Sequence, residues 1–272
     1  MSCPHCGKPL EHDGTYCYDC AHPWACECTI PYIDKDGNLR YGYRNPDEID
    51  YLDEFWLDEE EGLERVEVIK SNQKSDILDL TRHDVRALYY ITSIDNLQGI
   101  LALGILSHHQ ARDYEVTSRD ISDAEVQGLR GKKAIDGCPL HHYACLYFNP
   151  RNPMLSRLRG LNDELAILVV SPLVLLNPCT VFTDGNAASH ETKYYSGTKF
   201  LSRLNWKIIN SHYWTDHPDG KRIRCAEVLV KNEVSPDKIT RVLCHDRLAR
   251  ERCRQEVNGY EISLEIRSGL FF

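Results

Sequence analysis

The chain has 272 residues, 42% of them hydrophobic, which suffices for one large domain or for a medium domain with an appendage. Its longest apolar stretch, residues 165–176, is interrupted by Ser171 and Pro172, and a bilayer span needs roughly 20 mostly apolar residues, so we expect no membrane segment. The net charge of −9 combines an acidic region 1–85 (20 acidic, 8 basic, −12) with a weakly basic region 86–272 (21 acidic, 24 basic, +3), which is only weak support for a nucleic-acid partner.

The first 30 residues predict a small zinc ribbon. They begin without the apolar core of a secretory signal, so we expect a cytoplasmic protein. Two Cys-x-x-Cys pairs follow each other, Cys3 with Cys6 and Cys17 with Cys20. Four thiolates bind Zn²⁺ tetrahedrally, and such an ion stabilises a segment too short to bury a core. Free or redox-active thiols are the alternative.

Other potential ligands surround these four cysteines. We expect them to stay unbound, because four ligands already close a structural zinc site. They are His5, His12, His22, Cys26 and Cys28. The remaining cysteines are scattered along the chain and are expected to be small core residues.

Residues 31–85 are predicted to be an acidic linker. Within them, residues 46–64 carry ten acidic residues and no basic residue, which is typical of a solvated connector. The alternative is an internal decoy that occupies a basic groove of the next domain. Tyr51, Phe55 and Trp56 would supply its contacts.

Residues 86–272 have the pattern of a folded domain. Apolar runs predict strands at 87–92, 143–148, 164–170, 180–185, 225–230, 239–245 and 260–266. Helical patterns cover 93–104, 198–209 and 247–257. The first of these helices has Ser93 as a cap and Gly104 as its stop. Because helices and strands do not strictly alternate, we predict a mixed α+β domain.

Two loops of this domain carry candidate functional residues. In "YFNPRNPM" (147–154), two prolines bracket Arg151 after a strand and would hold it as a clamp for a phosphate or carboxylate. A plain surface turn is the simpler interpretation. In "DGNAASHETKYY" (184–195), small residues precede His190, which has either a structural or a functional role.

A glutamate in the strand "RCAEVLVKN" (224–232) is the most unusual residue of the domain. Glu227 shares one face of the strand with the apolar Cys225 and Leu229. A position exposed to solvent at the edge of a sheet would be the simple explanation for a glutamate on this face. A carboxylate inside a cleft would instead be a candidate for charge stabilisation or proton abstraction.

Several of these segments occur together in one order that resembles the DarT family. Members of this family are toxin enzymes that attach ADP-ribose from NAD to bases of single-stranded DNA. The resemblance covers about residues 86–272, and each motif is weak alone while the joint order is specific. The matching segments are 88–101, "AEVQGLRGKK" (124–133), 147–154, "SHETKYY" (189–195), 204–214, 225–230 and the ending "IRSGLFF" (266–272).

The resemblance implies an ADP-ribosyltransferase-like split β-sandwich with helices, preceded here by the zinc ribbon. It assigns catalysis to Glu227 and Arg130. Its cofactor-binding positions fall on Tyr90, Thr92, Arg130, Arg151 and Met154. Its acceptor-binding positions fall on Ser189 and His190, and Tyr147 is a candidate stacking residue. The family has a histidine where this chain has Tyr90, and a phenol does not become a cation near neutral pH.

The resemblance also implies partners and alternatives. NAD is the co-substrate, single-stranded DNA the favoured acceptor, and an antitoxin or other neutralising protein the expected partner. Single-stranded RNA is the second acceptor. A catalytically inactive, zinc-containing binding protein is the alternative from another class, supported by the missing histidine and opposed by Arg130 and Glu227.

Overall fold

The computed structural model describes residues 10–11, 16–17, 30–33, 39–42 and 74–272. They belong to two compact units, Met1–Arg86 and Ala87–Phe272. In the first unit, β1 (Leu10–Glu11) pairs antiparallel with β2 (Tyr16–Cys17), β3 (Ile30–Ile33) pairs with β4 (Leu39–Gly42), and a helix covers 74–82. The cysteine side chains predicted to bind zinc and the acidic segment 46–64 lie outside the described residues.

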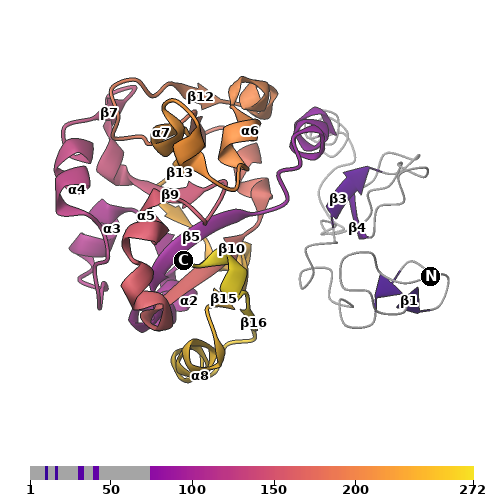
Figure 1. Cartoon of the computed structure of the whole chain (residues 1–272), viewed down its shortest axis with the longest axis vertical. Coiled ribbons are helices and arrows are strands. Elements are labelled where there is room, and N and C mark those ends of the chain that lie inside the picture. The colour runs from indigo at the N-terminus through magenta and orange to yellow at the C-terminus, as the bar shows by residue number, and fades with distance from the viewer. Residues whose placement is uncertain (1–9, 12–15, 18–29, 34–38, 43–73) are drawn as a thin grey trace, which may run out of the picture. The chain divides into compact units, whose positions relative to one another are not determined.

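An eight-stranded sheet forms the centre of the second unit (Figure 1). Neighbouring strands are antiparallel, except that β15 and β16 are parallel. The predicted α+β class is confirmed, and each predicted strand is present with both ends within three residues of the predicted ones. The strand order is β12 (Tyr194–Ser196), β11 (Val181–Thr183), β13 (Glu227–Lys231), β9 (Tyr143–Tyr147), β5 (Leu88–Ser93), β10 (Leu165–Val170), β15 (Ile239–Cys244) and β16 (Ser263–Ile266).

The sheet is divided between β9 and β5. Only one residue pair, Tyr89 with Tyr147, joins these strands, whereas β10 pairs with β5 from Leu165 to Val170. Two four-stranded halves therefore meet at a single bridge, which is how this chain builds the split that the family resemblance implies. Glu227 is the register partner of Tyr147, so it lies where the halves separate.

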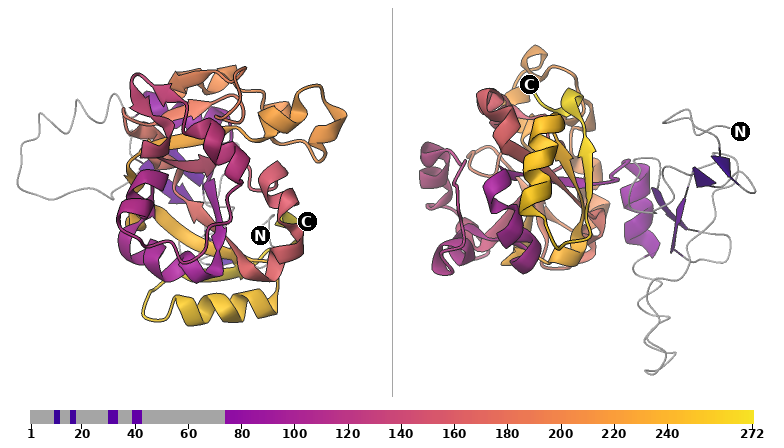
Figure 2. Two further views of the ribbon diagram at one scale, coloured as in Figure 1. Left: turned by 90° about the vertical axis from the view of Figure 1, so that its left-hand side faces the viewer. Right: turned by 90° about the horizontal axis from the view of Figure 1, so that it is seen from below.

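Strand β10 is buried at every position because both of its faces are covered. Ile167 and Val169 pack with Ile91, with Leu155 and with the C-terminal Phe271 in one hydrophobic cluster. Helix α8 (Arg247–Glu256) packs at the same end of the sheet against β10, β15 and β16 (Figure 2). Burial of each such side chain contributes about 1.5–3 kcal/mol, which explains the uninterrupted apolar run.

Short helices surround the sheet and begin at side-chain caps. Asp123 accepts hydrogen bonds from two backbone N–H groups of α4 (Ala124–Arg130), and Asn152 accepts one from Leu155 of α5 (Pro153–Arg157) at 3.1 Å. A side chain that accepts from these free N–H groups stabilises the first turn. The other α-helices of this unit are α2 (Leu97–Leu103), α3 (His108–Asp113), α6 (Trp206–Ile209) and α7 (Gly220–Arg224).

The 3₁₀ turns and short strand pairs complete the second unit. The turns are η2 (Ile94–Asn96), η3 (Leu140–His142), η4 (Arg159–Glu164), η5 (Pro172–Leu176), η6 (Thr198–Arg203), η7 (Trp214–Asp216), η8 (Pro236–Lys238) and η9 (Ser268–Leu270). The pairs are β6 (Ile105–Leu106) with β14 (Glu233–Val234) and β7 (Ala134–Ile135) with β8 (Cys138–Pro139).

Two predicted helices differ from the structure. The helix predicted at 198–209 is split into η6 and α6, because Leu204 is extended and Asn205 caps a new start by accepting from the N–H of Ile208 at 3.2 Å. The helix predicted at 93–104 begins as a 3₁₀ turn. Ser93 does not cap it, since its hydroxyl donates to Asp95 instead. Gly104 does end it, at φ +91°.

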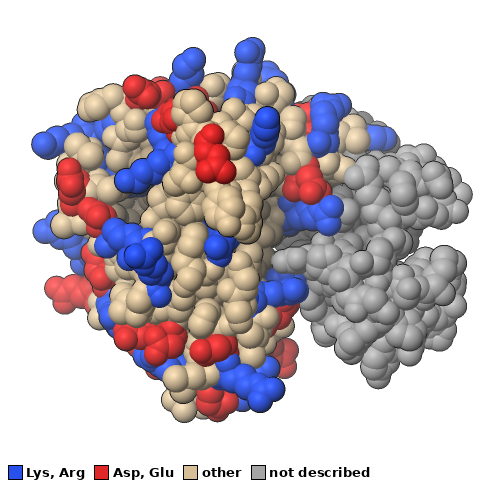
Figure 3. All heavy atoms as spheres, in the orientation of Figure 1, with Lys and Arg blue, Asp and Glu red and all other residues tan. Residues whose placement is uncertain are grey.

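The surface agrees with the small charge of this unit. Lys and Arg are interspersed with Asp and Glu over the face shown in Figure 3. Among the helices that the structure describes, none has the length and apolar character to cross a membrane.

Candidate active site

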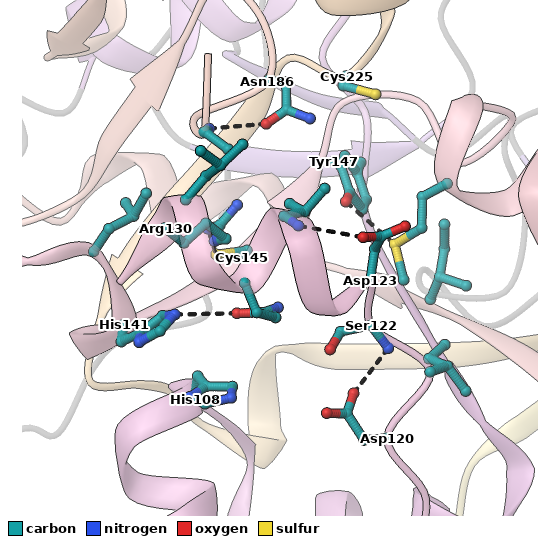
Figure 4. Close-up of a pocket in the computed structure, with 18 of the residues that line it drawn as sticks. His108, Asp120, Ser122, Asp123, Arg130, His141, Cys145, Tyr147, Asn186 and Cys225 are labelled. Atoms are coloured by element: carbon teal, nitrogen blue, oxygen red, sulfur yellow. Dashed lines mark hydrogen bonds between the residues drawn. The ribbon is translucent and has the colours of Figure 1, made fainter. Parts of the chain in front are cut away.

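A cavity of about 1290 Å³ opens next to the division in the sheet. It is wide enough for a dinucleotide and part of a second molecule, since ligand pockets commonly measure about 300–1,000 Å³. Strands β5 and β9, helices α3, α4, α5 and α7, and the loop after β11 contribute its walls (Figure 4).

Glu227 and Arg130 form a buried ion pair at this cavity. The Nη1 of Arg130 donates to the Oε2 of Glu227 at 2.8 Å. Glu227 is 1% exposed and Arg130 is 7% exposed, so the strand glutamate does not lie at a solvent edge. Arg130 belongs to the cavity lining and Glu227 lies directly behind it. Removing one partner of such a pair would leave a buried charge uncompensated.

Cys145 completes the surroundings of the guanidinium. Its sulfur accepts a hydrogen bond from the Nη2 of Arg130 (Figure 4). Cys145 and Tyr147 are two residues apart on β9 and therefore share a face with Glu227, the register partner of Tyr147. Tyr147 donates its hydroxyl to the sulfur of Met154 at 3.3 Å, which ties this strand to α5.

The pKa values of these groups are strongly shifted. Burial disfavours the Arg130 cation, but Cys145 and Glu227 stabilise it, and its pKa is raised. Burial raises the pKa of the Cys145 thiol to about 12 and holds the pKa of the Tyr147 phenol well above its usual value. Near neutral pH the site therefore presents a cation beside a neutral thiol and a neutral phenol.

The loop after β11 fixes the other oxygen of Glu227. The backbone N–H of Ala187 donates to its Oε1 at 2.9 Å. Lys133 donates to the carbonyls of Ala187 and Ser189, and the hydroxyl of Tyr194 donates to that of Ala187 at 2.6 Å. Both carboxylate oxygens are thus held in place before any ligand binds.

Most of the site residues expected from sequence lie around the cavity. Tyr90, Thr92, Tyr147, Met154 and Ser189 line it together with Arg130. Burial raises the pKa of Tyr90 to about 12. The structure thus gathers predicted site residues from 90 to 189 of the chain at one cavity, and Glu227 adjoins it through its contact with Arg130.

His190 and Arg151 do not line the cavity. His190 is exposed. Arg151 donates to the carbonyls of Gly269 and Phe271, and its guanidinium lies 4.0 Å from the ring centroid of Phe272. The contacts of Arg151 that the structure describes therefore hold its guanidinium against the C-terminal residues, whereas the sequence predicted a clamp for a phosphate or carboxylate.

Some residues of the site were not anticipated. Cys145 was expected to be an ordinary core cysteine, although its place two residues before Tyr147 on a strand would have indicated the same face. Lys133 and Arg222 hold the loop after β11 through contacts that no sequence pattern marks.

Comparison with known proteins agrees with this architecture. The family model described as ssDNA thymidine ADP-ribosyltransferase, DarT, matches residues 89–272. The chain belongs to the DarT family, as the sequence resemblance predicted.

Two individual relatives are similar in sequence to this chain. It is 35% identical over 182 residues to a DNA ADP-ribosyl transferase-DNA ADP-ribosyl glycohydrolase fusion protein of Thermosipho africanus, covering 65% of this chain and 47% of the relative. This chain thus spans about half of that protein. It is 32% identical over 156 residues to a DNA ADP-ribosyl transferase of a Thermus species, covering 53% of this chain and 73% of the relative.

Solved structures of the same two proteins share the fold. Thermosipho africanus DarTG in complex with ADP-ribose superposes with a TM-score of 0.64 at 33% identity, over 69% of this chain and 51% of the other. Thermus DarT in complex with ADP-ribosylated single-stranded DNA gives 0.62 at 25% identity, over 70% and 97%.

Proposed function

We propose that this chain transfers ADP-ribose from NAD to a base of single-stranded DNA and releases nicotinamide. The buried Glu227–Arg130 pair at a dinucleotide-sized cavity is the observation that carries the proposal. Family membership supports it, as do the names of the Thermosipho and Thermus relatives and their complexes with ADP-ribose and ADP-ribosylated single-stranded DNA.

Glu227 has the chemistry that breaking a glycosidic bond requires. As the C1′–N bond to nicotinamide breaks, positive charge develops on the ribose, as in sugar hydrolysis. Glu227 stabilises this charge by accepting a hydrogen bond from the ribose 2′-hydroxyl. A carboxylate offers roughly four acceptor positions, and Arg130 and Ala187 use two of them.

The same carboxylate completes the transfer. A base nitrogen forms the new bond to C1′ and gives its proton to Glu227. The acceptor must be unstacked before its ring atoms reach C1′, which favours single strands over duplex. Tyr147 has a ring at the cavity on which a base can stack, and Ser189 and His190 follow in the adjacent loop.

A second group of residues at the cavity holds the donor NAD. Arg130 gives NAD a fixed planar cation, and Met154 gives it an apolar contact. Tyr90 takes the position of the family's histidine and serves as a neutral hydrogen-bonding and stacking group. Thr92 supplies a hydroxyl, which already accepts from the amide of Asn96 at 3.2 Å. Arg151 supports the donor side only indirectly, by bracing the turn before α5.

The test is a mass measurement on matched DNA and RNA oligonucleotides after incubation with NAD. We expect an added ADP-ribose on single-stranded DNA, and fragmentation of the product identifies the base. Glu227→Ala and the isosteric Glu227→Gln should lower transfer by about 10²–10⁴ while remaining folded. Modification of RNA alone would favour the second acceptor. Absence of nicotinamide release with every acceptor would favour a binding protein.

The first 85 residues have a separate proposed role. We propose a zinc ribbon over 1–30, an acidic linker over 31–85 and the transferase domain over 86–272. Cys3, Cys6, Cys17 and Cys20 hold the Zn²⁺, and the antiparallel pair β1–β2, which joins the segment after the first Cys-x-x-Cys motif to the start of the second, supports this arrangement. Near-stoichiometric zinc by elemental analysis, lost in Cys17→Ser, is the expected result.

The partner of the ribbon is proposed to be a protein. Residues 1–34 contain one Lys, Lys8, and no Arg, so the ribbon has too little positive charge to bind nucleic-acid phosphates directly. The fusion of the Thermosipho relative to a DNA ADP-ribosyl glycohydrolase supports a neutralising protein as partner in the cytoplasm, where NAD is available. A chain without the ribbon should keep transfer and lose this partner.

A further inference from the structure

The loop between β11 and β12, residues 184–193, is held by two separate sets of contacts. The inner set surrounds Ala187, whose N–H binds Glu227 and whose carbonyl accepts from Lys133 and Tyr194. This set fixes the loop to the ion pair. It does not involve any atom of Arg222.

Arg222 of α7 provides the outer set. Its Nη1 donates to Asp184 at 2.8 Å and to the hydroxyl of Thr192 at 3.1 Å, and so bridges the two ends of the loop. Its carbonyl accepts from the N–H of Asn186 at 2.9 Å. Its Nε donates at 2.7 Å to Asp219, which precedes α7. The side chain of Arg222 is 15% exposed.

Gly185 lies directly against this guanidinium. A Cβ atom at position 185 would be 2.4 Å from Nη1 and 2.9 Å from Cγ of Arg222. These separations are too short for non-bonded atoms, and two carboxylates restrain the guanidinium, so a side chain at 185 must displace it. The φ angle of Gly185 is not in the left-handed region, and the close approach alone explains the glycine.

The charge of Arg222 is already matched. Asp184 and Asp219 both contact it, so the guanidinium has two carboxylate partners before any nucleic acid arrives. A phosphate contact would have to compete with both. The contacts of Arg222 therefore fit a structural link to the loop better than a site for the DNA backbone.

The residues between the two sets face the cavity. Ala188, Ser189 and Glu191 line it. A base that gives its proton to Glu227 must lie within hydrogen-bond reach of that carboxylate, and Ala187 already occupies one of its oxygens. The residues that follow Ala187 therefore border the acceptor.

We infer that Arg222 is a positioning residue that holds segment 188–191 in the shape that receives the acceptor base. This inference rests on the proposed transfer to single-stranded DNA. The inner contacts keep Glu227 in place without Arg222, so loss of Arg222 acts mainly on the acceptor.

Steady-state kinetics of Arg222→Ala give the first test. We expect the KM for the oligonucleotide to rise about tenfold or more, the size of one charge-assisted hydrogen bond, with smaller changes in kcat and in the KM for NAD. Arg222→Lys should recover part of the loss. Because Arg222 does not bind a phosphate in this inference, the slope of the oligonucleotide KM against salt concentration should be the same in Arg222→Ala as in the natural chain. An unchanged oligonucleotide KM, or a slope reduced by about one, would overturn the inference.

A double-mutant cycle with Gly185 gives the second test. Gly185→Ala should raise the oligonucleotide KM in the natural chain, because the new methyl displaces the guanidinium. In the Arg222→Ala background the same change should have little further effect, since the obstructing side chain is gone. Gly160→Ala is the matched control, because its Cβ would meet no atom within 4 Å. Simple additivity of the two changes would contradict the coupling.

Amide hydrogen exchange separates this inference from the proposed function. If the natural chain modifies no oligonucleotide, the proposed function fails, yet the loop can still be examined. Arg222→Ala should speed exchange of the N–H of Lys193, which donates to Asp184 at 3.0 Å, and leave β13 protected. Equal exchange in both proteins would show that Arg222 does not hold the loop.

Discussion

Two arginines of this domain were predicted to bind the same cofactor, and the structure gives them different surroundings. Arg130 ends α4 and points at Glu227 and Cys145 beside the cavity. Arg151 precedes α5 and binds the C-terminal carbonyls of Gly269 and Phe271 under the ring of Phe272. One guanidinium is paired with a carboxylate, and the other with backbone oxygens and an aromatic ring.

These different surroundings indicate different roles, a role in the reaction for Arg130 and a role in stability for Arg151. A carboxylate partner at a cavity leaves acceptor positions and charge available to a ligand. Backbone carbonyls and a ring face satisfy an arginine without offering a reactive group. Loss of Arg130 should therefore act on the rate of transfer, whereas loss of Arg151 should act on stability.

Replacing Arg130 by Lys should have the largest effect among the changes that test the different roles of Arg130 and Arg151. Lysine keeps the positive charge but lacks the planar fork that contacts Glu227 and Cys145 together. We expect transfer to fall by about 10²–10³ in kcat, measured as initial rates of nicotinamide release. Arg151→Lys is the control and should keep most of the activity. A loss of less than tenfold in Arg130→Lys would mean that the fork is dispensable.

The contacts of Arg151 predict an effect on stability. Arg151→Ala removes two hydrogen bonds and the contact with Phe272, and should lower the free energy of unfolding by about 1–2 kcal/mol. Denaturant titration measures this change, and activity per folded molecule should stay within about threefold. Arg159→Ala, at an exposed position, is the matched control. A large fall in kcat without destabilisation would make Arg151 part of the chemistry after all.

Local pattern explains why the sequence predicted some of this and missed the rest. The run at 164–170 specified a strand buried on both faces, and Glu227 was conspicuous because it interrupts an apolar face. Such signals are contained within a few residues. The partners of Arg151 lie 118 and 120 residues away along the chain. A pattern within a few neighbouring residues cannot predict that the turn at Arg151 packs against the C-terminal residues.

The same limit applies to the loop at 184–193. Its small residues and turn were visible in sequence, and Gly185 is required by a side chain that arrives from α7. Only packing brings Arg222, Lys133 and Glu227 around it. Strand alternation places Cys145 on the same face as Tyr147, but the sequence analysis took Cys145 for a core residue, and its place beside the ion pair depends on the pairing of β9 with β13.

Tyr90, which lines the same cavity as Arg130, gives a further test of the residues proposed to bind NAD. Burial raises the pKa of Tyr90 to about 12, so this phenol is neutral throughout the neutral pH range of the proposed assay. Tyr90→His introduces the histidine that the sequence resemblance implies for this position, a group that titrates between about pH 5 and 8. The imidazolium adds positive charge, so we expect the KM for NAD to fall as pH is lowered. Tyr90→Phe is the control, and an identical pH profile for both variants would exclude electrostatic contact with NAD.

The smallest expected effect concerns His141, which faces the Arg130 region from η3. Partial burial, the stacked ring of His108 with centroids 4.4 Å apart, and the charge of Arg130 together lower its pKa. A hydrogen bond to the backbone of Gln127 raises the pKa of His141 and only partly compensates, and the charge of His142 lowers it further. The Nε2 of His141 also lies 3.1 Å from the side-chain oxygen of Gln127.

A lowered pKa fixes the sign of the pH effect. The folded state favours the neutral ring, so this contribution to stability is complete above the usual pKa of 6.5 and is lost as pH falls through the lower folded value. His141→Gln should therefore make the fall in Tm between about pH 7 and 5 less steep, measured by thermal melting. His212→Gln is the control, because His212 is exposed and outside the cavity lining. Equal slopes in both variants would mean that protonation of His141 does not oppose folding, and that the positive charge of Arg130 is screened from its neighbours across the cavity.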